Sequence, residues 1–168
     1  MTGAWATLAV LLSQIGIPVG DHDRLAATLC AECLGCAKDE LAAIAHTALN
    51  RVRSGETWWG EGLVGVLDAP GQFAYPRTAA WCQDVPPEAP ARSAGHAGWS
   101  PGMLARWRRF RSAGERVAIG VLVGRIPDPV GWAMWFHVKR MGTVWPHLEA
   151  VDAPETWLHR FFRARRET

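Results

Sequence analysis

Two stretches in the first third of the chain have the periodicity of amphipathic helices. The first begins at a cap on Asp21 or Asp23 and stops at Gly35. Asp39 is expected to cap the second, which ends in a basic turn followed by Gly55. On this second helix, one apolar stripe holds Leu41, Ile44, Ala48 and Val52.

Residues 4–19 are almost wholly apolar, although polar and helix-breaking residues interrupt them. Nothing before Ala4 is charged, so the basic start of a signal peptide is lacking. We predict a core helix within residues 1–20, with an export or signal-anchor segment as the alternative. Residues 21–168 are expected to form a single domain.

The remainder of the chain predicts a loop, a long helix and short strands. Residues 82–102 are rich in Pro, Ala, Gly and Ser without a period, which indicates an irregular loop. Residues 103–123 predict a helix that is bent or broken near Gly114. Closely spaced aromatic residues over 132–162 predict short strands or extended segments.

Composition narrows the class of protein. The chain has 168 residues, of which 49% are hydrophobic and 20% charged, and this balance excludes intrinsic disorder. The net charge of +2 gives no strong preference for a charged partner. Ten tryptophans against one tyrosine indicate either a Trp-rich core or tryptophans that line a groove and stack on rings.

Cys30, Cys33 and Cys36 form a Cys-x-x-Cys-x-x-Cys run. Such runs occur in zinc and iron–sulfur sites, and a fourth ligand would come from Cys82 or a histidine. Residues 24–34 are expected to be helical, however, and a helix spreads the three thiols over an arc of about 120°. We therefore predict buried, small apolar cysteines, with neither a metal nor another cofactor.

Glu32 lies within the apolar stripe of the first helix, about 20° from the direction of Leu25 and about 40° from that of Cys36. A carboxylate there must be paired, neutral or facing a cleft. Desolvation raises the pKa of such a group, as in the general acid of lysozyme, and a glycosidase acid needs that property. A salt bridge to Arg51 or another arginine is the structural alternative.

Several short motifs, in one order over about residues 24–163, resemble the spore-cortex-lytic (SleB-type) family of cell-wall hydrolases. Its Ala-Glu-Ala-x-Gly motif is similar to residues 31–35 here, and its helix ending in Asn-Arg is similar to residues 48–52. Cys33, Leu34 and Cys36 depart from the family pattern. The other similar segments are Gly65-Val66-Leu67, Pro70-Gly71-Gln72-Phe73, Pro127-Asp128-Pro129-Val130-Gly131, Phe136-His137, Trp145 and His159-Arg160-Phe161-Phe162-Arg163.

The resemblance implies an α+β fold related to lysozyme, with a mainly helical lobe and a small antiparallel β part. It also implies cleavage of peptidoglycan between N-acetylmuramic acid and N-acetylglucosamine by lytic transglycosylation, with Glu32 as the catalytic acid and base. Glu32 would protonate the glycosidic oxygen and then take the proton of the muramoyl C6 hydroxyl as a 1,6-anhydro ring closes. If the reaction is hydrolysis, the candidates for a second acid are Glu40, Asp68 and Asp128.

Four further side chains are candidates for binding the sugar. Gln72 carries a donor and an acceptor, Phe73 and Tyr75 offer ring faces, and His137 can hydrogen-bond substrate or Glu32. The structural alternatives are a loop-bracing amide, core rings and a satisfied core histidine. The residues expected to be structural are Asn50, Arg51 and His159.

The alternative function is a non-catalytic glycan-binding or nucleic-acid-binding module on the same fold. Arginines alternate with aromatic residues over 106–111, and the tail over 160–166 contains further arginines. Arginine and aromatic side chains together can bind phosphates and stack on bases. The near-neutral net charge favours a solvated helix face, so no nucleic acid is expected, although an anionic wall or membrane surface can be contacted. The expected partner is the glycan strand, the expected state a monomer, and the expected place the cell envelope, as a periplasmic, wall-bound or phage-encoded enzyme.

Overall fold

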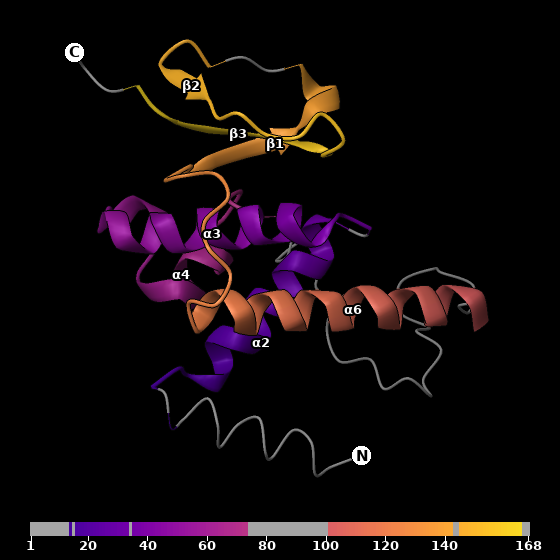
Figure 1. Ribbon diagram of the computed structural model, residues 1–168. Helices are drawn as coiled ribbons and strands as arrows, with labels where there is room; N and C mark the ends of the chain where they lie inside the picture. The colour runs from indigo at the N-terminus through magenta and orange to yellow at the C-terminus, as the bar shows by residue number, and fades with distance from the viewer. Residues whose placement is uncertain (1–13, 15, 34, 74–100, 143–144, 166–168) are drawn as a thin grey trace.

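The computed structural model describes residues 14, 16–33, 35–73, 101–142 and 145–165 (Figure 1). Tyr75, Cys82, most of the 82–102 loop and most of the apolar N-terminal segment lie outside these ranges. The described helices and strands confirm the α+β class. In chain order they are α2 (Val19–Glu32), α3 (Lys38–Ser54), a 3-10 turn (Thr57–Trp59), α4 (Gly62–Asp68), α6 (Pro101–Leu122), β1 (Trp135–Val138), a second 3-10 turn (Lys139–Met141), β2 (Leu148–Ala150) and β3 (His159–Ala164).

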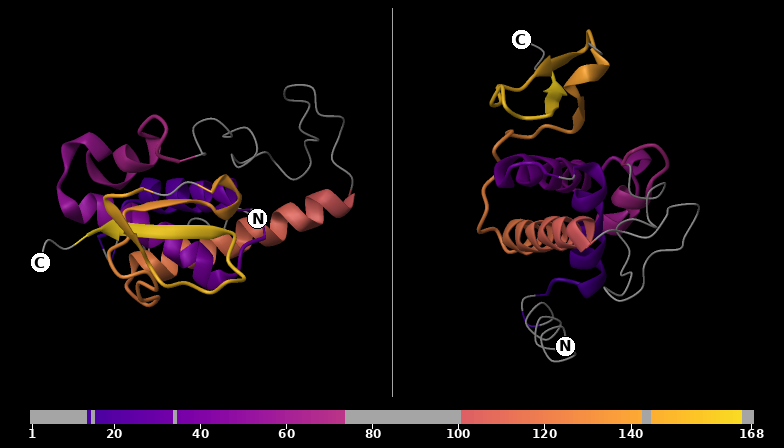
Figure 2. Two further views of the ribbon diagram at one scale, coloured as in Figure 1. Left: turned by 90° about the horizontal axis from the view of Figure 1, so that it is seen from above. Right: turned by 90° about the vertical axis from the view of Figure 1, so that its right-hand side faces the viewer.

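The helices form layers on one side of the sheet. α3 lies between the sheet and α6, while α2 crosses α6 and reaches α3 (Figures 1 and 2). Their apolar stripes meet in one core, because each amphipathic helix must bury its apolar face. Fully buried members of this core include Leu25, Ile44, Ala48, Val66 and Phe161.

α6 runs unbroken through Gly114, so the bend or break expected there is wrong. Gly114 instead faces α2, where an added Cβ would lie 3.1 Å from the Ala26 carbonyl oxygen and 3.7 Å from Leu29 Cβ. The glycine lets the two helices approach closely. Packing in this contact outweighs the helix-propensity cost of glycine, which is about 1 kcal/mol.

The expected aspartate caps are also wrong, because neither helix has a side-chain cap. α2 begins at Val19, so Asp21 lies inside its first turn and Asp23 beyond, while Asp39 lies inside the first turn of α3. First-turn carboxylates still favour the positive end of the helix dipole. The end of α3 is confirmed, because Gly55 adopts the left-handed conformation with φ +69°.

The short strands expected in the last third are confirmed. β3 is the middle strand, and both β1 and β2 pair with it in antiparallel register. Phe136 of β1 lies opposite Phe161 of β3, and their rings stack with centroids 5.7 Å apart. Since Phe161 belongs to the helical core, this face of the sheet covers the helices.

Candidate functional site

Glu32 is the last residue of α2 and is half-buried. The helix ends here because Cys33 is extended, with φ −150° and ψ 94°, although its N–H still donates to the Leu29 carbonyl. The helix expected through residue 34 is therefore shorter than predicted. Because Leu29 is fully buried, the core fixes the end of α2 and with it the position of Glu32.

Arg51, in the last turn of α3, is 4% exposed and lies between two aromatic rings. Its Cζ is 4.3 Å from the centroid of Trp59 and 4.8 Å from that of Phe73, and its Nε donates to the Met134 carbonyl at 2.8 Å. Burial lowers the pKa of Arg51 to about 10, and the negative charge of Glu32 opposes this shift. The guanidinium is thus charged at neutral pH, and it interacts electrostatically with Glu32.

Trp58 and Trp59 extend this stack to the surface. Their ring centroids are 3.5 Å apart; Trp59 is 2% exposed, whereas Trp58 is 57% exposed and donates from Nε1 to Glu56 Oε2 at 2.7 Å. Neither tryptophan was singled out from the sequence. The exposed Trp58 indole therefore packs on buried Trp59, which in turn packs on Arg51.

Gln72 and Phe73 follow the turn after α4. The Gln72 N–H donates to the Ala69 carbonyl at 3.2 Å, and Gln72 is half-buried. Phe73 is 3% exposed and packs against Arg51 and Phe136. Its ring therefore belongs to the core, as in the packing alternative, and Tyr75 lies outside the described residues.

His137 of β1 is 7% exposed and contacts a second group of rings. It stacks on Phe162 and meets Trp145 edge-on, with both pairs of centroids 5.1 Å apart. Its Nδ1 lies 2.9 Å from the Val138 carbonyl oxygen. The preceding residue, Phe136, instead packs on Phe161 and Phe73 on the side of the helices. His137 and Phe73 therefore have different ring neighbours: His137 packs on Phe162 and Trp145, and Phe73 on Arg51.

Asn50 ties the end of α3 to the turn that precedes the sheet. Its Nδ2 donates to Asp128 Oδ2 at 3.0 Å and to the Ala133 carbonyl at 3.2 Å, while Asp128 also accepts from the N–H groups of Val130 and Trp132. Burial alone raises the pKa of Asp128, but these hydrogen bonds outweigh it and the net pKa is lowered. Asn50 and Arg51 both brace the helix end, as expected.

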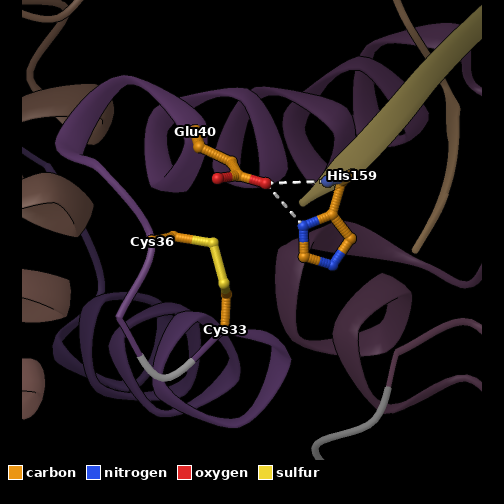
Figure 3. A group of neighbouring side chains, drawn as sticks. All are labelled: Cys33, Cys36, Glu40 and His159. Atoms are coloured by element: carbon orange, nitrogen blue, oxygen red, sulfur yellow. Dashed lines mark hydrogen bonds and ion pairs between the residues drawn. A yellow bond between two sulfur atoms is a disulfide. The ribbon is translucent and has the colours of Figure 1, made fainter. Parts of the chain in front are cut away.

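Cys33 and Cys36 form a disulfide across the turn between α2 and α3, with their Cα atoms 5.6 Å apart (Figure 3). The prediction of separate buried thiols along a helix is therefore wrong for this pair. Once α2 has ended at Glu32, Gly35 takes φ +108° and the chain turns back, which brings Cys36 to Cys33. Cys30 stays on α2 and is buried.

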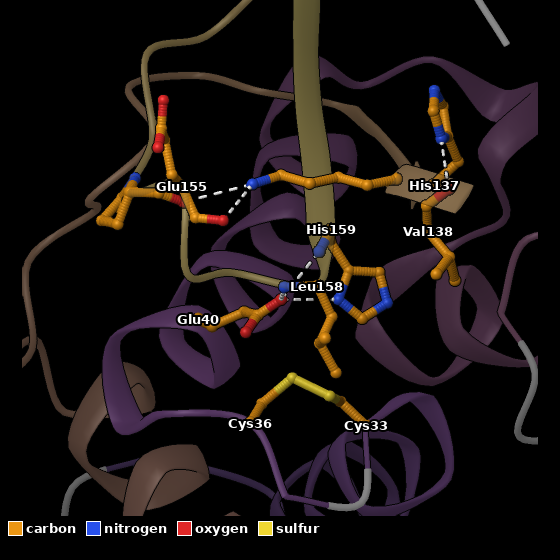
Figure 4. A network of polar contacts seen from close by, with 10 residues as sticks. Cys33, Cys36, Glu40, His137, Val138, Glu155, Leu158 and His159 are labelled. Atoms are coloured by element: carbon orange, nitrogen blue, oxygen red, sulfur yellow. Dashed lines mark hydrogen bonds and ion pairs between the residues drawn. A yellow bond between two sulfur atoms is a disulfide. The ribbon is translucent and has the colours of Figure 1, made fainter. Parts of the chain in front are cut away.

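Glu40 and His159 form a buried pair beside this disulfide, and each is 2% exposed. Glu40 Oε1 accepts hydrogen bonds from the N–H groups of Leu158 (2.7 Å) and His159 (2.8 Å) and from His159 Nδ1 (2.9 Å) (Figure 4). Within the described residues, His159 Nε2 is buried and has no hydrogen-bond partner. The pair joins β3 to α3, in line with the structural role expected for His159.

The arginines of α6 differ in environment. Arg111 is 7% exposed and pairs with Glu115, its Nε 2.9 Å from Oε1. Arg108 and Arg109 of α6 are exposed. One end of α6 projects past the other described helices (Figure 2). These two side chains are available to an anionic surface.

Comparison with protein-family models, with curated proteins and with solved structures finds no match for this chain. The function of this chain is therefore inferred from its residues and their geometry. Within the described ranges, no helix has both the length and the apolar character needed to cross a membrane.

Proposed function

We propose that the protein cleaves the glycan strands of peptidoglycan as a lytic transglycosylase, with Glu32 as the acid and then the base. The observation that carries the proposal is the position of Glu32, which is half-buried at a helix end that the core fixes. Its interaction with the charge of buried Arg51 is also what the salt-bridge alternative expects. The resemblance of the surrounding motifs to SleB-type hydrolases supports it, and a fold related to lysozyme belongs to the same proposal.

In the proposed reaction Glu32 works in both protonation states. The protonated carboxyl donates a proton to the glycosidic oxygen, and the bond between that oxygen and muramoyl C1 breaks. The positive charge of Arg51 favours the carboxylate, which then accepts the proton of the muramoyl C6 hydroxyl while that oxygen bonds to C1. The proton returns to Glu32, so the step balances without water.

The other candidate acids have structural partners, which supports a mechanism with one carboxylate. Glu40 accepts three hydrogen bonds at one oxygen, Asp68 lies 3.4 Å from Arg24 Nη2, and Asp128 holds the turn against Asn50. An ordinary glycosidase requires a second carboxyl group free to act as nucleophile or base. We therefore favour the anhydro product over a reducing end.

Trp58 is the side chain that we assign as a sugar platform. An exposed indole face stacks well on a sugar ring, and Trp59 and Arg51 support it from below. Gln72 precedes Phe73, which packs on Arg51, and remains the proposed amide ligand of an N-acetyl group. A contact between His137 and the sugar remains part of the proposal, and the imidazole is buried against Phe162 and Trp145.

The setting proposed for this activity is the cell envelope, as a housekeeping enzyme or a phage lysin acting as a monomer. The Cys33–Cys36 disulfide is typical of proteins in oxidising compartments. Arg108 and Arg109 provide a positively charged contact for anionic wall polymers.

The test is digestion of purified peptidoglycan followed by mass spectrometry of the products. We expect 1,6-anhydro-muropeptides from the wild type, none from Glu32→Gln, and a wild-type yield from the matched control Glu61→Gln, an exposed glutamate before α4. Reducing ends would make the enzyme a muramidase. Products that persist in Glu32→Gln, or glycan binding without any cleavage, would contradict the proposal.

A further inference from the structure

The disulfide and the buried pair beside it form one compact group of potential metal ligands. One donor atom from each of Cys33, Cys36, Glu40 and His159 lies within 4.8 Å of every other (Figure 3). In a tetrahedral zinc site with the usual bond lengths, donor atoms are about 3.3–3.8 Å apart. Small side-chain movements therefore bring all four donors to bonding distance of one ion, provided that the sulfur–sulfur bond is broken.

We propose that the reduced form of this protein binds one Zn²⁺ ion through Cys33, Cys36, Glu40 and His159. Two thiolates and an imidazole favour zinc over magnesium or calcium, which prefer oxygen ligands. Cys33, Glu40 and His159 are buried and Cys36 is half-buried, as expected of a closed structural site. The donors come from the end of α2, the turn, the start of α3 and the start of β3.

The groups around these ligands already orient them. The N–H groups of Leu158 and His159 hold the Glu40 carboxylate, and such outer hydrogen bonds typically fix a ligating side chain (Figure 4). The imidazole Nδ1, 2.9 Å from Glu40 Oε1, would exchange this hydrogen bond for the metal, and the buried Nε2, which has no hydrogen-bond partner among the described residues, would carry the ring proton. The turn with Gly35 at φ +108° provides the tight Cys-x-x-Cys geometry that a continuous helix does not.

The step from disulfide to metal site balances with a dithiol as the reductant. The dithiol transfers two electrons and two protons to the Cys33–Cys36 bond, which becomes two thiols, and is itself oxidised to a disulfide. Zinc then replaces the two thiol protons, which pass to solvent. The oxidised and zinc-bound forms are therefore alternative ways of closing the same turn beside Glu32.

The test uses the full chain, reduced by a dithiol, desalted without oxygen and titrated with Zn²⁺ or with Co²⁺ as a spectroscopic probe. We expect one ion per chain and, with Co²⁺, the absorption of a tetrahedral thiolate site. Affinity should fall more than about 100-fold in both Cys36→Ser and His159→Gln, because loss of a ligand costs more than the roughly 10- to 100-fold that loss of an outer hydrogen-bond partner costs. The matched control Cys30→Ala should bind as the wild type does.

Failure of the reduced wild type to bind zinc would overturn the proposal, as would equal affinity in Cys36→Ser. A pair that only reforms its disulfide, without taking up metal, would have the same consequence and would indicate a purely redox-active pair. Circular dichroism of each reduced variant shows whether it is folded. The result is independent of the glycan assay, because Glu32→Gln should bind zinc normally whether or not Glu32 cleaves peptidoglycan.

Discussion

Replacement of Arg51 by lysine tests whether the shape of the guanidinium, and not only its charge, holds the site together. The lysine keeps a positive charge near Glu32. It loses the Nε donor, which is 2.8 Å from the Met134 carbonyl oxygen, and the planar group between Trp59 and Phe73. Lysine and arginine are not equivalent at stacked, hydrogen-bonded positions.

The size of the effect follows from these contacts. A hydrogen bond from a charged donor contributes about 1.5–3 kcal/mol, and each cation–ring contact contributes about 0.5–1 kcal/mol or more. The lysine ammonium recovers part of the electrostatic attraction. We therefore expect a loss of about 2–4 kcal/mol in the free energy of unfolding, which lowers the Tm by roughly 5–15 °C in a domain of this size.

The measurement is urea and thermal unfolding followed by circular dichroism. The matched control is Arg53→Lys, two residues along α3, where the arginine is exposed and the expected change is within about 0.5 kcal/mol. If Arg51→Lys is as stable as this control, then the stack does not stabilise the protein and our account of the Glu32 environment is wrong.

Two further predictions concern packing and pH. Gly114→Ala should destabilise the protein by about 1–3 kcal/mol in urea unfolding, because its Cβ would lie 3.1 Å from the Ala26 carbonyl oxygen; a gain in stability from the better helix former would contradict the close-packing argument. Asp128→Asn should cost about 1–2 kcal/mol at neutral pH, because an amide nitrogen would face Asn50. Because folding lowers the pKa of Asp128, its carboxylate stabilises the folded protein at pH values above 3.8, the pKa of the unfolded chain. This stabilisation is lost as the pH falls through the pKa of the folded state. The difference between wild type and Asp128→Asn should therefore shrink in acid, and a difference that stays constant as the pH falls would contradict this account.

Local patterns predicted most of the described elements. The apolar stripe of α3, its end at Gly55 and the aromatic-rich strands all follow from periodicity and turn chemistry. The bend at Gly114 was predicted from intrinsic propensity, which tertiary packing against α2 overrides. The end of α2 was misplaced because its periodic pattern continues past Glu32, and only the backbone at Cys33 and Gly35 shows the turn.

The candidate site was predicted in part. Glu32 and Arg51 could be named because each lies on a helix with a readable stripe. Glu40 and His159 are 119 positions apart in the sequence, and no local pattern predicts their contact. Trp58 was missed because two adjacent tryptophans in the sequence do not show which of them the core buries; the structure buries Trp59 and leaves Trp58 exposed.

The same 119-residue separation has a consequence for how the chain folds. Helices form within microseconds from neighbouring residues, whereas closing so long a loop costs entropy and slows folding. During synthesis on the ribosome, Glu40 therefore stays hydrated on α3 until β3 has been made and can pack against it. The interval until His159 emerges is the time when chaperones and proteases compete for the unfinished domain.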